Sequence, residues 1–327
     1  MEKNIIFPGV LAPTAASGYK PGQIYLANEG AVNNQFLSEA LTQYSVGWKS
    51  PDGSLEKALR LLYGEPITVG KRFSFKKAND KVDFYACEND EDIRAIGADF
   101  QRYDWKGSTV DSHTLSKGLT QRIDRDELND DPEAEQKAVA NLRTILMRAE
   151  ILRGLNVLST NATNDAKTWG SGQNAADADA DVIAALVAGA KAAGIRPNQV
   201  LFGLTAWQKR FLTLRAASNS AVAMGASLAP EQIAGIYGVK TVAPIEHIYQ
   251  NGASKAAMAD SLVLAYNAQQ SGLKDDPSNI KQFVTKIGGG EYAVFREEHG
   301  AFVDVTVAHQ SQIVVTSTTG IRKLTIS

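Results

Sequence analysis

The sequence predicts an α+β fold, in which a long helix and an α/β segment are followed by antiparallel strands. Three patterns support this prediction. One amphipathic helical pattern covers about 132–153, strand and helix patterns alternate over 177–269, and residues 281–317 alternate with the period of two that is typical of antiparallel sheet. Residues 1–60 carry several glycines and prolines and lie outside these patterns.

The composition is that of an ordinary folded protein and excludes several classes. The chain has 327 residues, of which 44% are hydrophobic and 21% charged. A formal net charge of -2 argues against a protein that neutralises nucleic acid broadly. The single cysteine, Cys87, excludes an internal disulfide framework and is expected to be an apolar filler. No window approaches the ~20 apolar residues that cross a bilayer, and the first residues lack a signal-peptide pattern. We therefore expect a protein made in the cytoplasm with no membrane partner.

The first third of the chain is expected to reach beyond its own domain. Residues 1–60 predict an extended arm, or a disordered terminus if no neighbour orders it. Residues 61–123 predict strands at 72–76 and 108–123 around a polar loop at 88–107. Segments of ~15–20 residues at ~3.3 Å each span about 50–60 Å, more than contacts inside one domain need. We expect these segments to contact other copies of the chain.

The long helix has a clear predicted start and stop. Asp131 can cap it and Pro132 suits its first position, while Leu142 and Leu146 belong to one apolar face. Gly154 is expected to end it after roughly 22 residues, or ~33 Å. The α/β segment then contains predicted helices and strands at 178–193, 199–203, 230–237, 239–243 and 261–266.

The search for chemistry gives no catalytic, cofactor or metal site. Four histidines, His113, His247, His299 and His309, are far apart in sequence and fit no zinc motif, so we expect structural or exposed side chains. Residues 288–290 are three glycines without a following Lys-Ser or Lys-Thr pair, which predicts a hairpin turn and not a phosphate cradle.

Three acidic residues need a separate interpretation. Asp177, Asp179 and Asp181 resemble the start of a calcium loop, but Val182 stands where the loop needs glycine and Ala188 where it needs glutamate. We expect these carboxylates to cap the helix that follows and to interact favourably with its dipole.

The chain is not expected to be an enzyme. A hydrolase with an α/β domain over 178–267 is the alternative of another class, but no catalytic constellation supports it. The mixed charges at 122–127 suit a solvated face or an ion-pair network between subunits. The candidate residues for contacts between subunits are Arg72, Phe73, Phe75, Arg122, Asp124, Arg125, Asp126 and Glu127.

Three stretches carry a resemblance to a known family. They are SHTLSKGLTQRIDRDEL at 112–128, DVIAALVAGAKAAGIRPNQVLFGLTAWQKRF at 181–211, and GGGEYAVFREEHGAFVDVTVAHQSQIVVTSTTGIRKL at the end of the chain. In order and element type the chain resembles the tailed-phage major capsid proteins that share the Hong Kong 97-like shell fold. The resemblance covers most of the chain, through patterns of elements and not through invariant motifs.

The resemblance implies a domain plan. It consists of an N-terminal arm at 1–60, a projecting β-hairpin called the E-loop with its flanking strands at 61–123, and an axial domain at 177–269. The peripheral domain combines 124–176 with 270–327 and contains the long helix, called the spine helix.

The resemblance also implies a function. Hexamers and pentamers of the chain would build the icosahedral head around double-stranded DNA, in a virion assembled in the bacterial cytoplasm. Implied partners are a portal, a separate scaffolding protein, a decoration protein and the packaged DNA, bound without sequence preference. Some relatives join subunits by a Lys-Asn bond; lysines 71, 76, 77 and 81 lie in or near the predicted loop, without an assignable acceptor. An encapsulin-like compartment shell is the alternative within the same fold.

Overall fold

The computed structural model describes residues 36–77, 93, 94, 96, 99, 108–170, 177–217, 219–269 and 276–327. The first 35 residues of the predicted arm, nearly all of the predicted loop at 88–107, Lys81 and Cys87 lie outside the described residues. The chain divides into two units. Among the described residues, unit 1 comprises those within the ranges 1–48, 115–146 and 286–310, and unit 2 those within 49–114, 147–285 and 311–327.

Unit 1 is built on long antiparallel strands near the C-terminal end of the sequence. Its elements are α1 (Glu39–Gly47), β4 (Leu115–Asp124), α3 (Arg125–Asp130), the first part of α4 (Ala134–Asn161), β12 (Tyr292–Glu298) and the first part of β13 (Phe302–Val315). Strand β12 pairs with β13 in the register Tyr292↔His309, and β4 also pairs with β13. Of the three strands predicted over 281–317, the second and third are confirmed as an antiparallel pair.

Helix α1 corrects part of the predicted arm. Residues 39–47 are helical and not extended, because Ser38 caps the helix by accepting a hydrogen bond from the Leu41 amide. The Ser38 amide in turn donates to the Val294 carbonyl of β12, at 3.0 Å. For residues 36–47, the prediction that this segment finds partners only on other copies is therefore wrong. Helix α2 (Ser54–Tyr63) also lies partly within the segment that was predicted to be extended.

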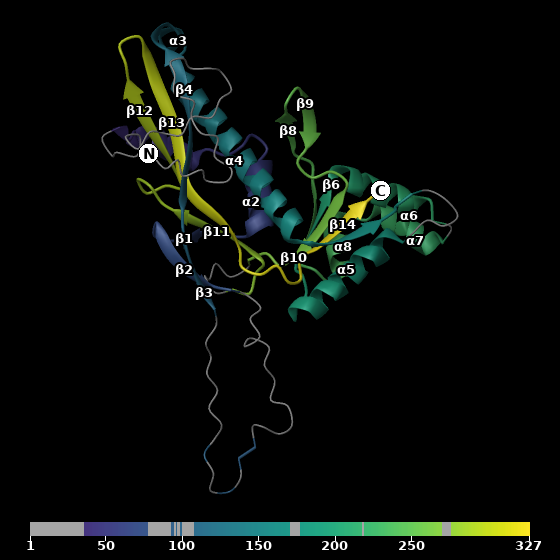
Figure 1. The fold of residues 1–327 in the computed structure, drawn as a ribbon. Coiled ribbons are helices and arrows are strands. Elements are labelled where there is room, and N and C mark those ends of the chain that lie inside the picture. The colour runs from purple at the N-terminus through teal and green to yellow at the C-terminus, as the bar shows by residue number, and fades with distance from the viewer. Residues whose placement is uncertain are drawn as a thin grey trace, which may run out of the picture. The chain divides into compact units, whose positions relative to one another are not determined.

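Unit 2 contains the predicted α/β arrangement. Its main sheet has the order β5-β14-β10-β6-β7, formed by β5 (Thr163–Lys167), β14 (Arg322–Ile326), β10 (Leu262–Tyr266), β6 (Gln199–Gly203) and β7 (Thr241–Ile245). Helices α5 (Ala178–Ala193), α6 (Leu204–Arg215) and α8 (Pro230–Tyr237) pack on this sheet (Figure 1), and α7 (Ser220–Met224) follows α6. The sequence analysis placed β5 and β14 in the predicted peripheral domain, apart from the other strands of this sheet. Their pairing joins residues far apart in the chain, and local patterns do not predict such pairing.

Unit 2 also contains smaller strand pairs. Strand β1 (Ile67–Thr68) pairs in parallel with β11 (Ile280–Thr285), and β2 (Arg72–Lys76) pairs with β3 (Thr109–His113) in antiparallel fashion, as predicted. The hairpin of β8 (Ile248–Asn251) and β9 (Ser254–Ala257) is a separate two-stranded sheet that projects from the main sheet (Figure 1) and was not predicted.

Helix α4 has 28 residues and extends past its predicted end. The predicted start is two residues early, because α4 begins at Ala134; the side chain of Asp131 accepts a hydrogen bond from the Glu133 amide at 3.1 Å in the turn before the helix and does not cap it. The prediction that Gly154 ends the helix is wrong. A Cβ at this position would lie 2.2 Å from the Tyr63 hydroxyl oxygen, and this hydroxyl donates to the Glu150 carbonyl. Gly154 therefore permits close packing of α2 against α4, and the helix continues because glycine does not force a stop.

Candidate assembly surface

The charged segment predicted as an assembly surface lies where β4 leads into α3. Asp124 is the N-cap of α3 and accepts from the Asp126 amide at 3.0 Å. Arg122 forms two hydrogen bonds with the carboxylate of Asp304 on β13, at 2.9 and 2.8 Å, and its guanidinium lies 3.5 Å from the centroid of the Phe302 ring. Arg122 is therefore held by strand β13 of its own chain.

The remaining charges of this segment face outward. Arg125 lies 3.6 Å from Glu298, and both side chains are about half exposed, at 49% and 53%. Hydrogen bonding to Arg296, and then its charge, lowers the pKa of Glu298, so this carboxylate is ionised near neutral pH. Asp126 and Glu127 are exposed, and no ion pair involves either of them among the described residues. The exposed surface of α3 is thus predominantly acidic.

The β2 candidates separate into buried and exposed side chains. Phe75 is buried and Phe73 half-buried, with ring centroids 5.9 and 4.4 Å from that of Phe283 on β11. These aromatic rings therefore contribute to a core within unit 2. Arg72 and Lys71 are exposed and have no ion pair to a described residue, so the outward side of β2 is basic.

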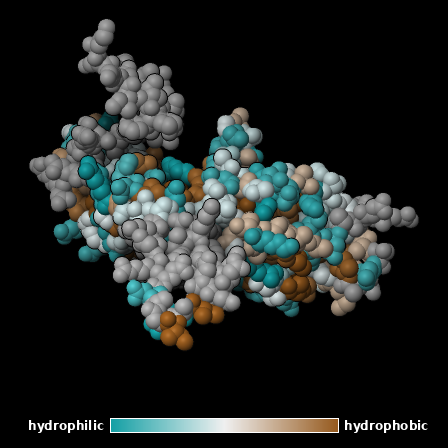
Figure 2. All heavy atoms as spheres, turned by 60° about the horizontal axis from the view of Figure 1, so that its bottom comes forward, coloured by the Kyte–Doolittle hydropathy of each residue, from teal (hydrophilic) through white to brown (hydrophobic). Residues whose placement is uncertain are grey.

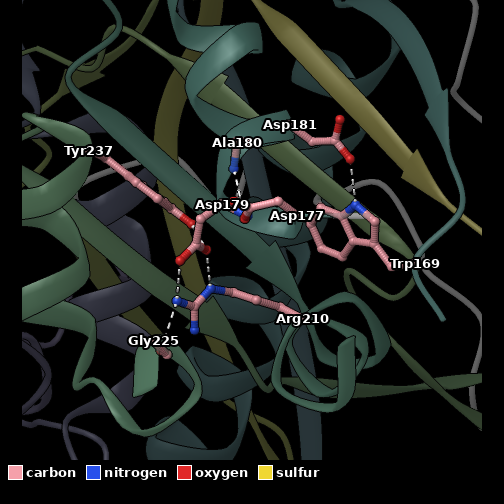
Figure 3. Close-up of polar contacts among 8 residues, drawn as sticks. All are labelled: Trp169, Asp177, Asp179, Ala180, Asp181, Arg210, Gly225 and Tyr237. Carbon is pink, nitrogen blue, oxygen red and sulfur yellow. Dashed lines mark hydrogen bonds and ion pairs between the residues drawn. The ribbon is translucent and has the colours of Figure 1, made fainter. Parts of the chain in front are cut away.

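The three aspartates at the start of α5 have three different roles. Asp177 caps the helix by accepting from the amides of Asp179 and Ala180, at 3.0 and 3.2 Å, which confirms the capping prediction (Figure 3). Asp181 accepts from the Trp169 indole at 3.0 Å and pairs with Lys167 at 2.9 Å. Trp169 and Lys167 precede the helix, so Asp181 fixes the chain that leads to it.

Asp179 is the centre of a buried network that the sequence analysis missed. Arg210 donates from Nε and Nη2 to the two Asp179 oxygens, at 2.7 and 3.0 Å, and Tyr237 donates to the same carboxylate at 2.6 Å (Figure 3). Nη2 of Arg210 also donates to the Gly225 carbonyl at 3.2 Å. Burial, aided by the charge of Asp179, raises the pKa of Tyr237 well above its ordinary value, so its hydroxyl remains a donor. The network joins α5, α6 and α8.

His309 and His299, which were considered as candidates for chemistry, pack against aromatic rings. His309 is buried edge-on to Tyr292, with ring centroids 4.9 Å apart, and His299 packs on Phe302. Within the described part of the chain, no three His, Cys, Asp or Glu side chains form a metal-binding group. Among the same residues, no helix is long and apolar enough to cross a membrane.

The glycine triplet forms a turn, as predicted, but not a hairpin turn, because the strands on either side of it, β11 and β12, do not pair with each other. The amide of Ile287 donates to the carbonyl of Gly290, and the amide of Gly290 donates back to Ile287. Gly288 and Gly289 have φ values of 58° and 85°, which glycine adopts without strain.

On the face shown in Figure 2, hydrophobic groups of the described residues are interspersed with hydrophilic ones. The large hydrophobic side chains exposed by more than 45% on the helices of unit 2 are Leu212, Met224 and Ile236.

Comparisons of the sequence with family models and with curated proteins give no match. Comparison of the structure gives clear matches. A phage-related protein from Bordetella bronchiseptica RB50 has a TM-score of 0.63 at 10% identity, covering 88% of this chain and 96% of that protein. The capsid protein of a native GTA particle has a TM-score of 0.50 at 11% identity, covering 96% and 95%. A virus-like particle protein from Pyrococcus furiosus has a TM-score of 0.50 at 13% identity, covering 88% and 98%.

The chain has the Hong Kong 97-like fold. The fold predicted from the order of elements is confirmed by likeness along nearly the whole chain, although identity of 10–13% shows the fold alone. Within this Hong Kong 97-like chain, the acidic surface of α3 and the basic side of β2 remain predicted contacts between subunits.

Proposed function

We propose that this chain is the major capsid protein of a tailed bacteriophage, a structural subunit that assembles as hexamers and pentamers into an icosahedral head around double-stranded DNA. One observation carries the proposal: the chain matches the capsid protein of a native GTA particle over 96% of its own length and 95% of that protein's. A match over both whole chains supports a shared role more strongly than a match of one domain would.

The proposed contacts between copies are electrostatic. Asp126 and Glu127 on α3 and Arg72 on β2 are exposed and have no ion pair among the described residues, which makes them suitable partners for charges on a neighbouring copy. One exposed ion pair contributes only about 0.2–1 kcal/mol, but a closed shell repeats each contact many times. The aromatic rings of Phe73 and Phe75 would support the strand from inside. Arg122 and Asp124 would hold the acidic helix in place, and the exposed Arg125 would contribute to the contact surface.

Further partners belong to the same proposal. A head of this kind needs a portal for DNA entry, a scaffolding protein that is separate from this chain, and in some cases a decoration protein. The net charge of -2 suits a shell that contacts packaged DNA without sequence preference. We place the mature protein in the virion, after assembly in the bacterial cytoplasm. The domain plan of arm, E-loop, peripheral domain and axial domain stays a prediction.

Electron microscopy and sedimentation test the proposal. The samples are the purified chain alone and the chain produced together with the proteins that its neighbouring genes encode. We expect rings, tubes or closed shells, with uniform size only when a scaffolding protein is present. A uniform monomer under all these conditions would contradict a shell function. Uniform shells from the chain alone would contradict the separate scaffolding protein.

The content of the particles distinguishes the alternative shell. If the chain forms a phage head, its gene lies near terminase and portal genes, and its particles contain DNA. An encapsulin-like compartment instead has a cargo-enzyme gene nearby and contains that enzyme.

A further inference from the structure

The part of unit 2 from α5 to β7 differs in charge from the rest of the chain. Residues 182–245 contain six basic side chains and one acidic side chain, whereas the rest of the chain contains 28 basic and 35 acidic side chains. One of the six, Arg210, is buried in the pair with Asp179. The other five are half-buried or exposed, and none of them has an ion pair among the described residues. This segment therefore attracts anions although the whole chain is slightly acidic.

The sheet topology brings three of these cations to one edge of unit 2. Helix α5 leads into β6 and helix α8 into β7 through short connections, and β6 and β7 are parallel neighbours. The C-terminal ends of both helices therefore lie where these strands begin. The Lys240 amide donates to the Asn198 carbonyl at 2.8 Å, which joins the two connections. The exposed residues Lys191, in the last turn of α5, Arg196 and Lys240 are together termed the basic edge.

Helix ends account for only part of this charge. Nη2 of Arg196 donates to the Tyr237 carbonyl at the end of α8, at 2.6 Å, and Lys191 lies near the last carbonyls of α5. Both cations therefore compensate a helix dipole, which amounts to about half an elementary charge at each end. Lys240 lies outside both helices. A net positive charge remains at the basic edge, since no carboxylate among the described residues pairs with any of its three cations.

Exposed hydroxyl groups lie beside the basic edge. Gly320 approaches α5 so closely that a Cβ on it would lie 2.6 Å from the Cβ of Ala193. The exposed Thr318 and Thr319 therefore lie near the last turn of α5. Lysine, arginine and threonine side chains are among the groups that contact phosphates in complexes of proteins with DNA. Cations flanked by hydroxyl donors fit a phosphate backbone better than they fit an isolated carboxylate.

We propose that the basic edge of unit 2 contacts the phosphate backbone of double-stranded DNA, an inference that rests on the proposed function because the packaged genome is the polyanion concerned. Lys191, Arg196 and Lys240 each neutralise a phosphate, and the contact is independent of base sequence because phosphates are the same at every step. The net charge of -2 agrees with a local contact and not with broad neutralisation of DNA. A shell repeats this weak contact in every copy.

Salt-dependent DNA binding by the purified, unassembled full chain tests the basic edge. The probe is a fluorescently labelled DNA duplex of mixed sequence, and fluorescence anisotropy gives the association constant at a series of salt concentrations. Each phosphate contact contributes about −0.9 to the slope of log K against log salt concentration. The triple variant Lys191→Gln/Arg196→Gln/Lys240→Gln should therefore reduce the magnitude of this slope by about 2.7.

A matched control separates the site from the net charge. The triple variant Lys49→Gln/Lys57→Gln/Lys255→Gln changes three exposed lysines elsewhere in unit 2 and lowers the net charge by the same amount. We expect it to keep the slope of the unmodified chain. Equal slopes for the unmodified chain and the basic-edge variant would overturn the proposal, as would equal reductions in the two triple variants.

A second variant does not depend on the helix ends. If Lys191 and Arg196 only compensate helix dipoles, their loss lowers the thermal stability measured by circular dichroism and leaves the slope unchanged. Lys240→Gln alone avoids this loss, because Lys240 belongs to neither helix. It should reduce the magnitude of the slope by about 0.9, and an unchanged slope would contradict the DNA contact.

Electron microscopy separates this inference from the proposed function. The basic-edge variant should form the same particles as the unmodified chain, because DNA and not a neighbouring copy occupies the edge. A variant that kept its slope but no longer assembled would assign the basic edge to a contact between copies and overturn the DNA contact. Absence of particles from the unmodified chain would contradict the proposed function, whereas the slopes are measured on unassembled protein in either case.

Discussion

The Arg210–Asp179 pair in unit 2 and the Arg125–Glu298 pair in unit 1 join the same kinds of groups in different surroundings. The Arg210 and Asp179 side chains are 2% and 17% exposed, whereas those of Arg125 and Glu298 are 49% and 53% exposed. Water screens the second pair and leaves its charges free to interact with a new partner. The comparison shows that burial, and not pairing alone, decides how strongly an ion pair contributes to the stability of the fold. Assembly is the proposed role of the exposed pair.

The largest expected effect comes from breaking the buried pair. Asp179→Ala leaves the Arg210 guanidinium buried without its carboxylate and removes the acceptor of the Tyr237 hydroxyl. We expect a loss of about 3–5 kcal/mol in the free energy of unfolding, the usual cost of removing one partner of a buried pair. Urea denaturation followed by circular dichroism measures this loss. A loss below about 1 kcal/mol would show that water reaches the pair as easily as it reaches Arg125.

A smaller effect is expected two residues earlier. Asp177→Ala removes the N-cap of α5 but no buried charge, so we expect a loss of about 1 kcal/mol in the same measurement. Asp177→Ser should restore most of it, because a serine hydroxyl also caps. Equal losses for Asp177→Ala and Asp179→Ala would show that Asp179 contributes no more to stability than a helix cap does.

The smallest effect on stability is expected at the exposed pair. Arg125→Ala should change the free energy of unfolding by less than about 1 kcal/mol, because both side chains are hydrated. Its effect on assembly should be larger than its effect on stability, since it changes the charge around α3. Thermal unfolding and the yield of sedimenting particles measure the two separately. A large loss of stability with unchanged assembly would place this pair in the fold and not in the assembly surface.

Much of the fold was predictable because it follows from local sequence patterns. The amphipathic pattern of α4, the strands of β12 and β13 and the glycine turn between Ile287 and Gly290 each depend on neighbouring residues. The cap at Asp177 was predictable for the same reason. Gly154 was misinterpreted because local rules describe glycine as a helix end, whereas here a tyrosine from another helix requires it.

The candidate surface was predictable only in part. The sequence indicated the charged residues of β4 and α3, but it could not distinguish Arg122, which Asp304 holds, from Asp126 and Glu127, which remain exposed. Nor could it separate the buried Phe75 from the exposed Arg72 on the same strand without knowing which face packs on Phe283.

The sequence by itself determined the order and type of the main elements, and through them the fold class, because helix and strand periodicity are properties of adjacent residues. Only the tertiary structure decided which charges are buried and which strands pair. Asp179 and Arg210 are 31 residues apart, and β5 and β14 pair across a still longer separation. Such contacts depend on how complete elements pack, since burial is a property of the packed chain that no local pattern records.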